Sequence, residues 1–119
     1  MKTTNNKKQL IAALAAVAAL NPDGYTVDAR TLQPVTSGYA VAVLDTQNSF
    51  GADGLARVVN YVAAHDHVTA FGGWLDRETG LYYYDATIIC STLEEAKDMA
   101  RKNKQIAIFN LDNLEEIRL

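Results

Sequence analysis

Residues 68–90, VTAFGGWLDRETGLYYYDATIIC, decide the fold, because they read as two β-strands joined by a tight turn. The turn segment Asp76–Gly80 begins with a residue that favours Asx-type turns and ends with a glycine, which tolerates positive φ. We therefore predict a β-hairpin closed by a loop of about four or five residues. The same stretch contains the only Trp of the chain and three of its six Tyr, and the other elements are expected to pair with this hairpin or to cover it.

The two faces of this hairpin follow from the alternation of side chains along a strand. We place Leu75 opposite Leu81 across the turn, so that Trp74 faces Tyr82. One face is then almost wholly apolar and should be covered by helices; it carries Val68, Ala70, Trp74, Tyr82, Tyr84, Ala86, Ile88 and Cys90. The other face is mixed and should be open or meet a partner; it carries His67, Thr69, Phe71, Tyr83, Asp85 and Thr87.

Length and composition place limits on the fold and on the partners. The chain has 119 residues, of which 49% are hydrophobic, enough for one domain spanning residues 1–119 and too few for two. The formal net charge is -3 and the basic residues are scattered, so we expect no nucleic-acid partner held by phosphate contacts. A single cysteine, Cys90, excludes an intramolecular disulfide and is typical of a reducing compartment.

The N-terminal segment, residues 1–24, is predicted to be a helical extension that ends at Asn21-Pro22-Asp23-Gly24. Its lysines precede the Ala-rich run Leu10–Leu20, a layout shared with weak secretory signals. We expect a cytoplasmic protein, with secretion as the alternative if residues 1–19 act as a signal peptide. Eleven residues of helix span only about 16 Å, so we expect no membrane-spanning segment.

The remaining elements are predicted in chain order from hydrophobic periodicity. An edge strand within 25–32 precedes a strand at 38–44, a helix at 53–64, the hairpin, a helix opened by a capping box at 91–95, a strand at 105–109 and a short strand at 115–119. The core 38–110 thus has the βαββαβ order of a ferredoxin-like plait, with an added N-terminal helix and a short C-terminal strand. This α+β fold puts 38–44 and 81–90 in the centre of the sheet and both crossover helices on one face. The N-terminal helix should cover the other face or meet a second subunit.

Few side chains are arranged for chemistry. His65 and His67 are two residues apart and on a strand could hold a metal with one further ligand, but the sequence offers no second ligand pair. We therefore predict no metal site and no cofactor. Asp85 beside Tyr83 and Thr87 fits either a general acid or base or, more commonly, a hydrogen-bonding cluster on a surface. We assign no catalytic residue.

Three segments carry a resemblance to other proteins: GYAVAVLDTQNSFG, GGWLDRETGLYYYDATII and LEEAKDMARKNKQIAIFNLDNLEEIRL. In these segments the chain resembles small proteins encoded by phages and mobile elements of gut bacteria. The resemblance covers about residues 38–119 and brings no established activity, so it implies a cytoplasmic host setting and no functional residue.

The leading hypothesis is a small non-enzymatic module that binds a protein partner, a regulatory factor or a second copy of itself. The expected surface comprises the mixed sheet face and the loop Asp45–Phe50, namely Phe71, Tyr83, Asp85, Thr87, Asp45, Gln47 and Asn48. One variant, mimicry of nucleic acid against a host nuclease, requires acidic residues clustered on one face. The alternative is a ligand-binding or enzymatic plait with a pocket near Trp74, Tyr83 and Asp85, between the sheet and the N-terminal helix.

Overall fold

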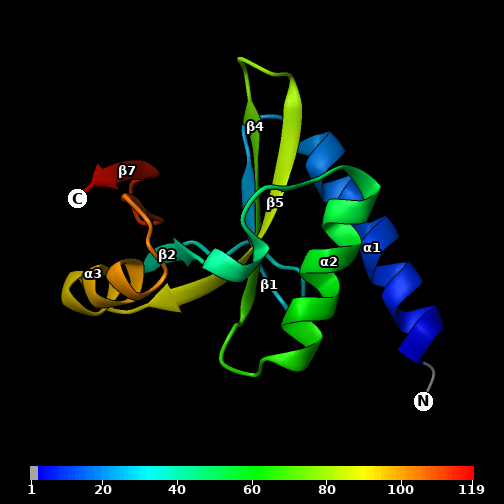
Figure 1. The fold of residues 1–119 in the computed structure, drawn as a ribbon, viewed down its shortest axis with the longest axis horizontal. Helices are drawn as coiled ribbons and strands as arrows, with labels where there is room; N and C mark the ends of the chain where they lie inside the picture. Colours follow the sequence, from blue (N-terminus) through cyan, green and yellow to red (C-terminus); the bar gives the residue numbers. More distant parts are fainter. Residues whose placement is uncertain (1–2) are drawn as a thin grey trace.

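The computed structural model describes residues 3–119 and has the mixed α+β architecture that the sequence predicts (Figure 1). It contains three α-helices: α1 (Thr3–Leu20), α2 (Gly51–Ala64) and α3 (Leu93–Lys102). The seven strands are β1 (Tyr25–Asp28), β2 (Tyr39–Ala42), β3 (Ser49–Phe50), β4 (Ala70–Asp76), β5 (Leu81–Cys90), β6 (Ala107–Asn110) and β7 (Glu115–Arg118). Among the described residues, no helix combines the length and apolar character needed to cross a bilayer.

All strands belong to one sheet with the order β1-β4-β5-β2-β6-β7, and every neighbouring pair is antiparallel. The two strands predicted to be central, β5 and β2, do lie in the middle. The short strand β3 continues the line of β2 along β5, after an excursion through a 3-10 turn at Leu44–Thr46. Strand β1 adds an outer edge beside β4, and β7 adds the opposite edge beside β6.

The hairpin of β4 and β5 forms as predicted, with a four-residue loop at 77–80. The Asp76 carboxylate accepts a hydrogen bond from the backbone N–H of Glu78 at 3.0 Å, which is the expected Asx turn. Gly80 has φ 77° and donates its N–H to the Asp76 carbonyl at 2.7 Å. Asp76 and Leu81 are therefore the first paired residues of the hairpin.

This closure shifts the register by one residue from the prediction. Leu75 pairs with Tyr82 rather than Leu81, and Trp74 pairs with Tyr83. Because paired residues of antiparallel strands share a face, Phe71 lies with Ala86 on the helix side, while Trp74 joins Tyr83 on the opposite side. The two predicted faces of β4 are thus exchanged, whereas the predicted faces of β5 are correct. Phe71 is 1% exposed and belongs to the core.

A single hydrophobic core fills the space between one face of the sheet and the three helices. The strands contribute Val27, Val41, Phe71, Ala86, Ile88 and Ile108, and the helices contribute Leu14, Leu55, Val58, Val59, Ala96 and Ala100. Helix α1 lies beside α2 (Figure 1) and buries Leu14 completely in this core. The prediction that α1 covers the other face is therefore wrong. That face carries Asp85 and Thr87, whereas the helix side offers the apolar surface that an Ala-rich helix can cover.

Helix α3 begins within the predicted capping segment 91–95, with Thr92 as its N-cap residue. The Thr92 hydroxyl accepts a hydrogen bond from the backbone N–H of Glu95 at 3.2 Å. In return the Glu95 carboxylate accepts the backbone N–H of Ser91 at 3.3 Å, one residue earlier than in the usual capping box. The cap fixes the direction of α3 and allows Ala96 and Ala100 to pack closely on the sheet.

Candidate functional site

The face of the sheet that points away from the helices carries a line of three aromatic rings, which we call the aromatic row: Phe50, Tyr83 and Trp74. The Trp74 and Tyr83 rings are stacked, with centroids 5.0 Å apart and planes at 14°. Phe50 meets the other side of Tyr83 edge-on at 5.5 Å. Although the rings contact one another, Trp74 remains 48% exposed and Phe50 45% exposed. The row therefore offers a preformed apolar surface to solvent.

The register of three strands places these rings side by side. Tyr83 on β5 pairs with Trp74 on β4 and with Phe50 on β3. The row continues along β5 to Leu81, which is on the same face and partly exposed. Because each ring projects from a paired strand, the sheet sets its orientation. Binding a partner would therefore cost little conformational entropy for these side chains.

The loop before β3 borders the aromatic row and is held by a single arginine. The Arg57 guanidinium, on α2, donates to the carbonyl of Asp45 at 2.8 Å and to that of Gln47 at 3.3 Å. It also donates to the hydroxyl of Ser49 at 3.2 Å. These bonds leave the side chains of Asp45, Gln47 and Asn48 exposed on a loop whose backbone is fixed.

Two buried hydroxyls complete the anchoring of this loop. The Thr46 hydroxyl accepts the backbone N–H of Ala86 at 3.1 Å, which replaces a ladder bond where β2 has left the sheet. The Ser49 hydroxyl donates to the Thr46 carbonyl at 2.7 Å. Both side chains are almost fully buried, so their hydrogen bonds are protected from water.

Gly54 explains how closely α2 approaches this loop. A Cβ atom at this position would lie 2.5 Å from the carbonyl carbon of Ser49 and 3.0 Å from its Cα. We predict that Gly54→Ala destabilises the protein by about 1–2 kcal/mol, because the backbone at Ser49 must move to relieve the overlap. Urea denaturation measures the loss, and Ala56→Gly, at a part-buried site of the same helix, gives the cost of exchanging these residues alone. A stability for Gly54→Ala equal to or above wild type would contradict the close approach.

Asp85 lies next to the aromatic row on the same face. Its carboxylate accepts a hydrogen bond from the Thr87 hydroxyl, and both groups lie over Gly72 on the neighbouring strand. Burial raises the pKa of Asp85 to about 6, against the lowering effect of the Thr87 hydrogen bond. No ion pair with Asp85 occurs among the described residues. The arrangement is a hydrogen-bonded pair of a carboxyl group and a hydroxyl group on this face of the sheet.

The predicted pocket near Trp74, Tyr83 and Asp85 does not lie under α1, since these side chains and α1 are on opposite sides of the sheet. A cleft of about 690 Å³ does exist, but it opens between α1, α2 and the ends of β1 and β4. None of the three predicted pocket residues lines that cleft.

The structure therefore brings together most, but not all, of the predicted surface residues. Tyr83, Asp85 and Thr87 are adjacent on β5, with Thr87 almost fully buried, and Asp45, Gln47 and Asn48 lie on the bordering loop. Phe71 is in the core. Sequence reasoning included Phe50 only as the end of the loop Asp45–Phe50, whereas it lies in β3 and pairs with Tyr83. It also put Trp74 on the wrong face, because the face of Trp74 depends on the exact length of the hairpin loop.

The two histidines pack as surface groups. The His65 ring stacks on Tyr61 at 3.8 Å and its Nδ1 lies 2.8 Å from the Tyr61 carbonyl oxygen. His67 lies edge-on to His65 at 5.9 Å. Across residues 3–119 no three His, Cys, Asp or Glu side chains are grouped so that they could hold a metal ion.

No protein-family model, no curated protein and no solved structure matches this chain.

Proposed function

We propose that the protein is a non-enzymatic binding module that docks a protein partner on the aromatic row and the loop beside it. The observation that carries this proposal is the exposure of Phe50 and Trp74 in a row of contacting rings on a face that no described helix covers. Interface hot spots are enriched in Trp and Tyr.

The surroundings of the row favour a protein over a small molecule as the partner. The rings lie along a sheet, and the neighbouring groups are exposed loop side chains and the Asp85–Thr87 pair. An apolar centre with a polar rim is the usual anatomy of a protein interface. The loop is pre-ordered by Arg57, so docking would cost little conformational entropy.

The test is affinity capture from a bacterial lysate together with light scattering of the purified protein. We expect a specific protein partner, or a concentration-dependent dimer, that is lost when Trp74→Ser and Tyr83→Ser are combined. The loss of two ring contacts should weaken binding by about 100-fold or more. The matched control combines Leu20→Ser and Leu114→Ser. Both leucines lie outside the row, and their side chains are more exposed than that of Trp74.

The controls decide the interpretation. Equal capture by the row variant and the control variant would show that the row is not the interface. A purified protein that stays monomeric and captures nothing would reject the proposed function as a whole. Far-ultraviolet circular dichroism of both variants checks that each is folded.

We further propose that β4, β5, β2 and β6 with α2 and α3 form a ferredoxin-like plait within a larger sheet. The spatial order of these four strands and their antiparallel pairing support it. Strands β1 and β7 and helix α1 are then additions to the plait. An origin in phages or mobile elements, and action inside the cytoplasm of a host bacterium, are part of the same proposal and rest on the sequence resemblance.

Mimicry of nucleic acid receives no support from the distribution of acidic residues. Exposed carboxylates occur on the loop at Asp45, on α2 at Asp53, on α3 at Glu94 and on β7 at Glu116. They are therefore spread over several elements and not gathered on one face.

A further inference from the structure

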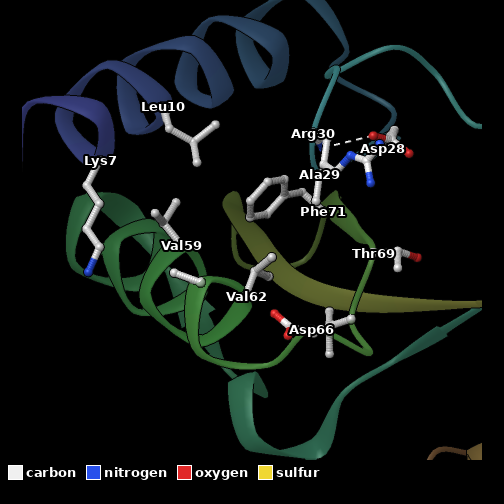
Figure 2. Close-up of a pocket in the computed structure, with 12 residues that line it drawn as sticks. Lys7, Leu10, Asp28, Ala29, Arg30, Val59, Val62, Asp66, Thr69 and Phe71 are labelled. Carbon is white, nitrogen blue, oxygen red and sulfur yellow. Dashed lines mark hydrogen bonds between the residues drawn. The ribbon is translucent and has the colours of Figure 1, made fainter. Parts of the chain in front are cut away.

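The cleft between α1 and α2 is a second surface feature, remote from the aromatic row. Its volume of about 690 Å³ is in the range of small-molecule sites. Figure 2 shows Leu10 from α1, Val59 and Val62 from α2, and Phe71 from the sheet projecting toward the same space. Leu10 and Val62 are partly exposed and form the accessible floor of the cleft, whereas Val59 and Phe71 are buried behind them.

The ionic groups at the rim are unevenly distributed. Lys7 lies at one end of the cleft, and Arg30 and Asp28 lie together at the other (Figure 2). The Asp28 carboxylate already accepts hydrogen bonds from the backbone N–H groups of Arg30 and Thr31 and from the Thr31 hydroxyl. These bonds lower the pKa of Asp28 and keep it charged beside Arg30.

Lys7 therefore gives its end of the cleft a positive charge without a competing carboxylate. No ion pair involving Lys7 occurs among the residues that the structure describes. Asp66 also lines the cleft, on the side of Thr69 and away from Lys7 (Figure 2). The cleft thus has an apolar floor, with Lys7 at one end and Arg30 beside Asp28 at the other. An apolar floor that ends at a lysine matches a molecule with an aliphatic tail and one anionic head directed at Lys7.

We propose that this cleft binds an aliphatic carboxylate, with the tail over Val62 and Leu10 and the carboxylate at Lys7. The tail removes apolar surface from water, and the carboxylate gains a charge-assisted hydrogen bond from the lysine ammonium. This site is independent of the aromatic row, which lies across the sheet.

The test uses decanoate and 1-decanol as a matched pair of probes, titrated into ¹⁵N-labelled protein below their aggregation concentrations. For decanoate we expect saturable amide shifts at Leu10, Val62 and Thr69 and none at Tyr83. Lys7→Met should weaken decanoate about tenfold and leave 1-decanol unchanged, because only the charged head loses a partner. Lys8→Met, at the next and more exposed position of α1, is the matched control and should change neither probe.

A third variant blocks the cleft without touching the core. Ala63 lines the cleft yet is exposed, so Ala63→Phe should fold normally and weaken both probes by about tenfold or more. The absence of saturable shifts at the cleft, equal binding of the two probes by wild type, or equal effects of Lys7→Met and Lys8→Met would each overturn the proposal. Spectral dispersion of each variant confirms the fold, and none of these outcomes depends on a protein partner.

Discussion

Replacing Phe71 with alanine should lower the free energy of unfolding by about 3–5 kcal/mol, the largest loss that we expect from any single truncation in this protein. Phe71 is 1% exposed and is the largest of the fully buried side chains. Its ring contributes to the shared core of the sheet, α1 and α2, and it lies on the same face as Val27 and Ala86. Alanine would leave a cavity that these separate elements cannot close without moving.

Trp74→Ala is the matched comparison, because it removes an aromatic ring three residues along the same strand. Trp74 is half exposed, so its truncation should cost about 1 kcal/mol or less. Urea unfolding followed by circular dichroism measures both variants. If Trp74→Ala proved more destabilising than Phe71→Ala, the hairpin register described here, and with it the exposed aromatic row, would be wrong.

This pair of residues shows where sequence reasoning stopped. The strands, the turn and both crossover helices were predictable, because Asp76 and Gly80 supply turn chemistry and the apolar residues of α2 and α3 recur at helical spacing. The register was not predictable, because loops of four and five residues fit the same turn sequence. A shift of one residue in pairing leaves the faces of β5 unchanged and exchanges those of β4. Trp74 and Phe71 therefore lie on the faces opposite to those predicted.

The side of the sheet that α1 covers depended on the same register, because the register decides which face of β4 is apolar. Its Ala-rich surface fits almost any apolar layer, so the sequence did not select a side of the sheet. Once Phe71 faces the helices, the core is wide enough to include Leu14 as well. The candidate surface was identified in part, since the alternation within β5 correctly grouped Tyr83, Asp85 and Thr87. Phe50 was predicted only as the end of a loop, because β3 is two residues long and its partner Tyr83 is more than thirty residues away in the sequence.

The second large effect is a gain in stability. Asp85→Asn should stabilise the protein at neutral pH by about 2 kcal/mol, because it removes a carboxylate that is poorly solvated in the folded state. The amide keeps an oxygen that can accept the Thr87 hydroxyl, and it occupies the same space over Gly72. The substitution therefore preserves the contact and deletes the charge.

The pH dependence of this gain has a defined sign. The pKa of Asp85 is about 6 in the folded protein and close to its ordinary value of 3.8 in the unfolded chain. Below about pH 4 both states carry the proton, so the wild-type carboxyl costs nothing and the variant gains nothing. As pH rises from about 4 to 6 the unfolded chain releases its proton first, and wild-type stability falls until the folded protein also ionises. Above about pH 6 the penalty is constant, and the gain of Asp85→Asn is complete.

Urea unfolding of wild type and Asp85→Asn at pH 3.5, 5 and 7.5 therefore should give a difference that grows from near zero to about 2 kcal/mol. Glu116→Gln, at an exposed carboxylate on the same sheet face, makes the same change in net charge and is the control. A gain of equal size at all three pH values would mean that burial of the Asp85 charge is not the source of the gain. A loss of stability at pH 7.5 would mean that the charge is needed, and would direct attention to a cationic partner for this face. Either result would change the charge expected on the part of the partner that docks beside Tyr83.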